Sequence, residues 1–121
     1  MFAPINAVCA LDPGVIALLG SPPQRLYSFG EAAQDTVKPY AVWQTISGSP
    51  DNYLAGRPDI DGFTLQVDVF ATCAKDARAV AKALRDAIEP CAYITRWGGE
   101  SRDPVTKNYR YSFDVDWIVQ R

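Results

Sequence analysis

The sequence predicts an α+β fold, with a mainly antiparallel sheet and helices packed on one face of it. Two patterns lead to this prediction. Apolar and polar residues alternate over residues 63–69 and 109–119, as in strands that bury one face. Between them, over residues 74–89, apolar residues recur at helical intervals, so a helix is available to cover the buried face. With 121 residues, the chain has the usual length of one domain, residues 1–121.

Near the N-terminus, the sequence predicts two short helices, at residues 3–11 and 13–19. The carboxylate of Asp12 is suited to cap the second helix, and Pro13 suits its first position. Gly20 stands where a helix commonly ends on a glycine.

Strands and loops alternate in the next part of the chain. Residues 24–29 are expected to form a short strand, followed by a loop over residues 30–38. Residues 40–47 are rich in aromatic and β-branched types and predict a strand that ends at Gly48. The residues from 49 to 61 are dense in turn formers and predict a long loop, which is often functional in so small a domain.

The helix predicted at residues 74–89 has start and stop signals. Thr72 is a candidate cap, Asp76 falls in the first turn, where it suits the helix dipole, and Pro90 ends the helix. The residues expected to be buried are Ala77, Val80, Ala81, Leu84 and Ile88.

The C-terminal part predicts a hairpin. A strand at residues 92–97 leads to Gly98 and Gly99, which we interpret as turn residues, and a further turn lies near Asp103. The long strand that follows places its apolar side chains on one face: Tyr109, Tyr111, Phe113, Val115, Trp117 and Val119.

The composition argues against several classes of function. Apolar residues make up 48% and charged residues 21%, as is usual for a folded chain. A net charge of −2 does not favour a nucleic-acid partner. No stretch is long and apolar enough to span a bilayer, and the first residues lack a targeting pattern. We therefore expect a protein made in the cytoplasm, with no membrane partner and no sequence-specific nucleic-acid partner.

The residue types needed for common catalytic and metal sites are scarce. The chain has no histidine, which removes the commonest general base and the usual zinc ligand. The cysteines, Cys9, Cys73 and Cys91, are an odd number and widely spaced, so they indicate neither a disulfide framework nor a metal site. We expect no enzyme activity, no catalytic residue, no metal and no cofactor.

Two acidic patterns have plain structural explanations. Residues 57–62 resemble part of a calcium-binding loop, but Arg57 stands where the first ligand belongs, so Asp59 and Asp61 are interpreted as solvated loop carboxylates. Asp114 and Asp116 share one face of a strand, and alternation alone explains them as solvent-facing positions.

The order and spacing of four segments resemble the phage tail completion or head-to-tail joining family, which has tail terminator relatives. The segments are residues 12–20, residues 39–50, residues 65–71 with the helix after them, and residues 102–115. This resemblance implies an α+β subunit that forms a ring, expected to be hexameric, at the end of the tail tube. It implies a virion location in the tail or neck, contacts with the tail tube protein and the head connector protein, and no catalysis.

Ring subunits need two different complementary surfaces, and the sequence offers exposed sheet edges and the loop at residues 49–61. Aromatic and arginine side chains concentrate interface energy. The expected contact residues in this loop are therefore Tyr53, Leu54 and Arg57, together with Asp59 and Asp61. The alternative is that Tyr53 and Leu54 fold back onto the core of their own chain.

Two other functions remain open from the residues alone. A monomeric ligand- or peptide-binding module would form a pocket from Trp97 and the loop at residues 49–61. A small enzyme would use the pair Asp114 and Asp116, although nothing supplies a matched acid and base.

Overall fold

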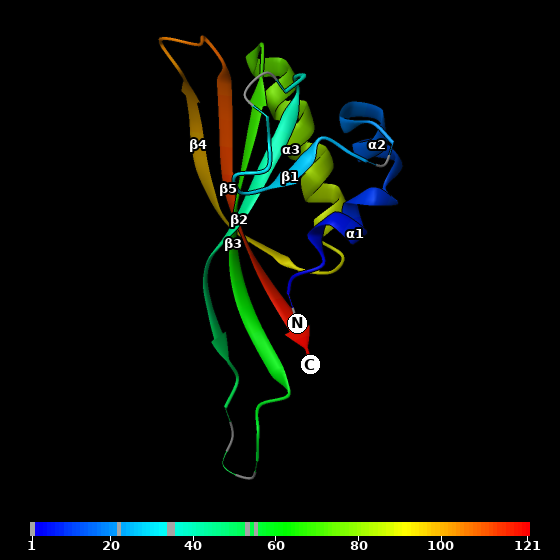
Figure 1. Ribbon diagram of the computed structural model, residues 1–121, viewed down its shortest axis with the longest axis vertical. Coiled ribbons are helices and arrows are strands. Elements are labelled where there is room, and N and C mark those ends of the chain that lie inside the picture. The colour runs from blue at the N-terminus through cyan, green and yellow to red at the C-terminus, as the bar shows by residue number, and fades with distance from the viewer. Residues whose placement is uncertain (1, 22, 34–35, 53, 55) are drawn as a thin grey trace.

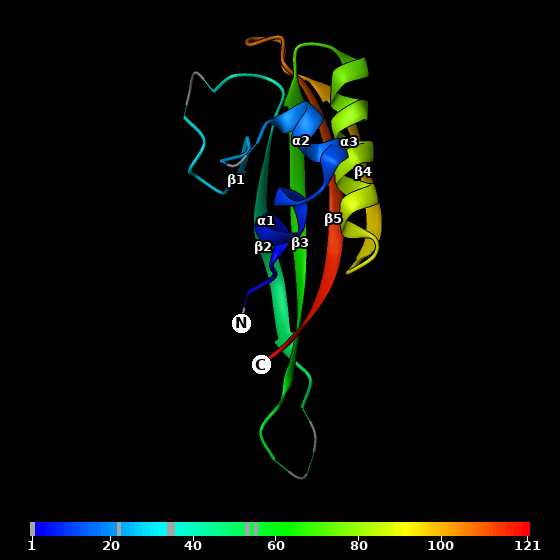
Figure 2. The same ribbon diagram turned by 90° about the vertical axis from the view of Figure 1, so that its right-hand side faces the viewer.

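The protein folds into one five-stranded sheet with helices on one of its faces (Figures 1 and 2). The computed structural model describes residues 2–21, 23–33, 36–52, 54 and 56–121. The helices are α1 (Ile5–Ala10), α2 (Pro13–Leu19) and α3 (Ala74–Ile88); the strands are β1 (Leu26–Ser28), β2 (Tyr40–Pro50), β3 (Ile60–Ala71), β4 (Tyr93–Arg102) and β5 (Tyr109–Gln120). The strand order is β1-β2-β3-β5-β4, and β1 pairs parallel to β2 whereas the other pairs are antiparallel. The predicted α+β class is confirmed.

The residues at the start of the chain form the two expected helices, α1 and α2. Asp12 precedes α2, and its carboxylate accepts a hydrogen bond of 3.1 Å from the backbone N–H of Val15. Pro13 is the first residue of the helix. Gly20 ends it with a φ of 90°, a conformation that favours glycine.

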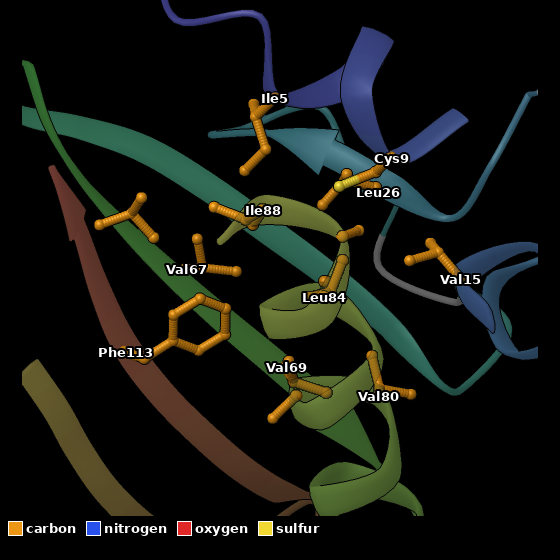
Figure 3. Close-up of a cluster of buried hydrophobic side chains, with 14 of the residues drawn as sticks. Ile5, Cys9, Val15, Leu26, Val67, Val69, Val80, Leu84, Ile88 and Phe113 are labelled. Carbon is orange, nitrogen blue, oxygen red and sulfur yellow. The ribbon is translucent and has the colours of Figure 1, made fainter. Parts of the chain in front are cut away.

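The core lies between the helices and one face of the sheet (Figure 3). All five apolar residues predicted to be buried in α3 are buried, and α3 packs on β3 and β5. Phe113 from β5 and Val67 from β3 point toward Leu84 and its neighbours on α3, and α1 contributes Ile5. Burying a side chain such as Leu84 contributes about 1.5–3 kcal/mol before the loss of conformational entropy.

The start of α3 differs from the prediction. Cys73, not Thr72, is the residue that precedes the helix, and it makes no side-chain capping hydrogen bond. Its backbone is extended, with φ of −147° and ψ of 159°, so the helical geometry begins only at Ala74. Asp76 lies in the first turn of α3, as predicted, where its negative charge suits the helix dipole.

Strands β2 and β3 are longer than predicted and extend beyond the helices. The predicted end of β2 at Gly48 is wrong, because pairing continues through Ser49 with Gly62 and through Pro50 with Asp61. The loop is therefore limited to residues 51–59. We call residues 48–62 the arm, which projects from one end of the molecule in both views (Figures 1 and 2).

The two glycines of β4 were interpreted wrongly as a turn. Gly98 and Gly99 lie within the strand, at a shift of register between β4 and β5. Gly98 lies so close to Ser112 that a Cβ would be 3.2 Å from its carbonyl oxygen, and Gly99 has a φ of 100°. The turn is formed later, where the carboxylate of Asp103 accepts a 2.8 Å hydrogen bond from the backbone N–H of Val105.

Candidate functional site

The base of the arm is held by an ion pair between Asp61 and the last residue of the chain. The Nε of Arg121 lies 2.8 Å from one carboxylate oxygen of Asp61, and its Nη2 lies 3.0 Å from the other. The backbone N–H of Arg121 also donates to the carbonyl oxygen of Asp59, at 2.8 Å. The C-terminal end of β5 is therefore tied to the first residues of β3 by both backbone and side chain.

Asp61 does not have the solvated environment that its sequence context predicted. Its side chain is buried, with 5% of the residue exposed, because it lies within β3 rather than in the loop. The hydrogen bonds from Arg121 lower the pKa of Asp61 below its usual value. The carboxylate is therefore ionised and engaged within its own chain, whereas the side chain of Asp59 is exposed.

The tip of the arm presents side chains that have no cover from their own chain. Leu54 is fully exposed and Arg57 is exposed, so Leu54 does not fold back onto the core. Tyr53 lies outside the described residues. The expectation that these residues contact another chain stays a prediction.

A groove crosses the sheet at the base of the arm, on the face opposite the helices. The groove has a volume of about 510 Å³. Its floor is made of the small residues Ser49, Gly62 and Thr64, and its walls include Tyr93 and Ile118. Because Gly62 and Thr64 alternate along β3 with residues that face the helices, they face the other way. We call this feature the groove.

The cross-strand pairing explains the shape of the groove. Ser49 pairs with Gly62, which pairs with Ile118, and Thr64 pairs with Asp116, which pairs with Tyr93. Small side chains therefore occupy β2 and β3, and larger ones occupy β5 and β4. Tyr93 and Ile118 are 67% and 59% exposed, so the walls of the groove are apolar and accessible.

Asp116 places a carboxylate in the groove. It is exposed and accepts a hydrogen bond of 2.8 Å from the hydroxyl of Thr64. Asp114 lies on the same face, as predicted, and one of its oxygens is 3.7 Å from a guanidinium nitrogen of Arg96. The two carboxylates thus have different partners.

A network of polar side chains covers the adjoining part of the same face. The carboxylate of Asp68 accepts hydrogen bonds from Arg110, at 3.0 Å, from Ser112 and from Gln66. These groups satisfy one another across β3 and β5. The groove is therefore bordered by a polar surface whose charges are already paired.

Among the described residues, Trp97 lies far from the arm loop, so they do not form the expected pocket. Trp97 packs with its ring edge-on to Tyr111, with the ring centroids 5.8 Å apart. Trp97 pairs with Phe113 in β5, which pairs with Val67 in β3. Ile60, the first residue of β3, comes seven residues before Val67. At about 3.3 Å per residue, Trp97 and the start of the loop are roughly 23 Å apart.

The described part of the chain holds neither a metal-binding cluster nor a membrane-spanning helix. In residues 2–121, apart from the five positions outside the description, no group of three or more acidic, cysteine or histidine residues is placed to hold a metal ion. Across the same described residues, helices long and apolar enough to cross a membrane are absent. The three cysteines are free, with Cys9 buried and Cys91 exposed.

The sequence interpretation missed both the ion pair and the groove. Asp61 and Arg121 are 60 residues apart, and nothing local to either residue indicates the other. The signal that could have found them is the register of β3 with β5, which pairs Ile60 with Gln120 and so brings the chain end to Asp61.

The fold defines a small α+β domain whose sheet continues beyond the helices into an exposed arm. The model of the family described as Tail completion protein gp17 matches residues 3–120. The chain therefore belongs to the tail completion protein gp17 family, and its role is a structural one in the assembly of a phage tail.

The fold is also found in a solved virion structure. A chain from the virion of a native gene transfer agent particle superposes with a TM-score of 0.74, over 97% of this chain and 92% of that chain. The two chains are 14% identical, so this likeness shows the fold. No protein with a curated function matches the chain.

Proposed function

We propose that this protein closes the end of the phage tail tube as a ring of six copies and joins the tail to the head. The observation that carries the proposal is the arm, which leaves Leu54 fully exposed at its tip although the rest of the fold is well packed. A large apolar side chain without cover favours burial against another chain. Membership of the tail completion family supports a position at the end of the tail.

The two exposed surfaces at one end of the molecule fit the needs of a ring. The arm projects outward, and the groove at its base is concave. A contact between two different surfaces can repeat from copy to copy. The copies form a closed ring when the rotation between neighbours allows it. Exposed strand edges at β4 and along the lower part of β2 are further surfaces for the tail tube protein and the head connector protein.

The contact residues we propose are those of the arm loop: Tyr53, Leu54, Arg57 and Asp59. Asp61 acts through Arg121, by holding the base of the arm, rather than by touching the partner. The proposed action needs no catalysis and no cofactor. The protein would be made in the host cytoplasm and be incorporated in the neck of the virion.

The experiment is to assemble phage particles without the gene for this protein and to measure their tails by electron microscopy. We expect tails of irregular length, or tails of normal length that do not join heads. Supplying the protein in trans should restore joined particles. Normal tails joined to heads in its absence would contradict the proposal. A protein that stays monomeric at every concentration and on purified tails would favour the ligand-binding module instead.

A further inference from the structure

We propose that the tip of the arm of one copy docks in the groove of the next copy, with Leu54 between the apolar walls and Arg57 paired with Asp116. This inference rests on the proposed function, because it names the contact that holds the ring together. The occupant of the groove is thus a second copy of this chain.

The apolar match is the first argument. Leu54 is fully exposed, and the groove offers two accessible apolar walls, Tyr93 and Ile118. Between them Gly62 leaves open space, because a Cβ built there would meet nothing nearer than the carbonyl oxygen of Ser49, at 3.9 Å. A glycine within a strand often marks a place where another backbone approaches closely. The groove therefore has room for an apolar side chain and the loop that carries it.

The charge match is the second argument. Arg57 is exposed on the arm, three residues after Leu54, and forms no ion pair within the described part of the chain. Asp116 in the groove is likewise exposed and, within the same described residues, is hydrogen-bonded to Thr64 without a cationic partner. Opposite charges at two surfaces that meet fix their register and exclude wrong partners.

The geometry of the fold is the third argument. Figure 1 shows the arm pointing away from the sheet, so the tip of a copy does not occupy the groove of the same copy. The arm and the groove nevertheless lie at the same end of the molecule, since Gly62 belongs to both. A neighbouring copy that is rotated so that its arm crosses the base of the first arm therefore places its tip at the groove. The contact is between unlike surfaces and so repeats around a ring.

The test is a charge exchange between the two surfaces. The variants are Arg57→Asp, Asp116→Arg and the two together, and the measurement is the oligomer distribution of the full chain by native mass spectrometry and sedimentation over a concentration series. Lys82→Asp is the matched control, because Lys82 is an exposed cation on α3, away from both surfaces. Circular dichroism at each concentration verifies that every variant is folded.

We expect each single change to raise the concentration needed for assembly about tenfold or more, because it sets like charges against each other. The double variant should assemble within about threefold of the wild type, and Lys82→Asp should assemble like the wild type. Single variants that assemble normally, or a double variant no better than the worse single one, would overturn the docking.

A second variant tests the apolar part of the contact. Gly62→Val should fold, because the added Cβ meets only ordinary contacts, but it fills the floor of the groove and should weaken assembly. Assembly of Gly62→Val at the wild-type concentration would overturn the inference. If the wild type forms a ring that none of these variants disturbs, the docking contact is excluded and the proposed function still stands. If the wild-type chain never assembles, both the docking contact and the proposed ring are excluded.

Discussion

The carboxylate of Asp61 and the guanidinium of Arg121 form two hydrogen bonds, of 2.8 and 3.0 Å, at the base of the arm. Such a two-point pair fixes orientation as well as distance. It links the end of the chain to the strand that leads out of the arm. The pair is thus placed to hold the arm at a defined angle to the sheet.

Replacing Asp61 by Asn should loosen the base of the arm. The neutral amide cannot balance the charge of Arg121, so the end of β5 should separate more easily from β3. We expect faster amide hydrogen exchange at the start of β3 and a thermal midpoint lower by a few degrees. Asp59→Asn is the control, since that side chain is exposed, and it should leave both quantities unchanged. Unchanged exchange in Asp61→Asn would show that the pair does not hold the arm.

The contribution of Asp61 should disappear in acid. Its pKa is lowered in the folded protein by hydrogen bonds from Arg121, so folding is favoured when the group is ionised. The stabilisation is complete above the unfolded pKa of about 3.9 and is lost as the pH falls through the lower folded value. Urea unfolding of the wild type and Asp61→Asn from pH 7 to pH 2.5 should show a constant difference that shrinks below about pH 4. A difference that is constant to the lowest pH would contradict this origin.

The cysteines should react with thiol reagents at very different rates. Burial raises the pKa of Cys9 to about 12, so at pH 8 only about one molecule in ten thousand carries the reactive thiolate. Cys91 is exposed and should react at once. We expect Cys9 to react only at the rate of unfolding, as followed by mass spectrometry after labelling. Rapid labelling of Cys9 in the native protein would show that α1 opens readily.

Two glycines of the arm should respond in opposite ways to the same change. A Cβ at Gly48 would lie 2.8 Å from a ring carbon of Phe63, whereas a Cβ at Gly62 meets nothing nearer than 3.9 Å. Gly48→Ala should therefore destabilise the protein by about 1–3 kcal/mol, and Gly62→Ala should change its stability by less than about 0.5 kcal/mol. Urea unfolding of both variants measures the difference. Equal stabilities would mean that the Phe63 ring moves aside at little cost.

Truncating the centre of α3 tests the core. Leu84 is fully buried between the helix and the sheet. Leu84→Ala should lower the free energy of unfolding by about 2–5 kcal/mol, and Leu84→Asp or Val80→Asp should prevent folding. Lys82→Ala, on the exposed side of the same helix, should have an effect below about 0.5 kcal/mol. A small effect of Leu84→Ala on the free energy of unfolding would show that Leu84 is not part of the buried core.

The parts of the fold that were predicted correctly are those in which one local rule decides the structure. The alternation along β3 and β5 and the helical spacing in α3 each set a buried face, and those faces meet. The cap at Asp12 and the end at Gly20 are equally local. Such features depend on residues within a few positions of one another, so the sequence is enough to locate them.

The errors arose where pairing between distant strands overrides local propensity. Pro50 is typical of a turn, yet it lies in β2 because it pairs with Asp61 across the hairpin. Gly98 and Gly99 are also typical of a turn, yet β4 continues past them with a shift of register against β5. The groove and the ion pair depend on the same registers, so no pattern within one segment could predict them.

The arm is separate from the core, because Leu54 and Arg57 in its loop are exposed and none of the described residues between 48 and 62 belongs to the buried apolar cluster. We therefore expect mutations in the loop to have little effect on folding. Under the proposed function, the contact surface can then diverge between lineages while the fold is kept. The same fold could then be used in different phage particles whose subunits do not assemble with one another.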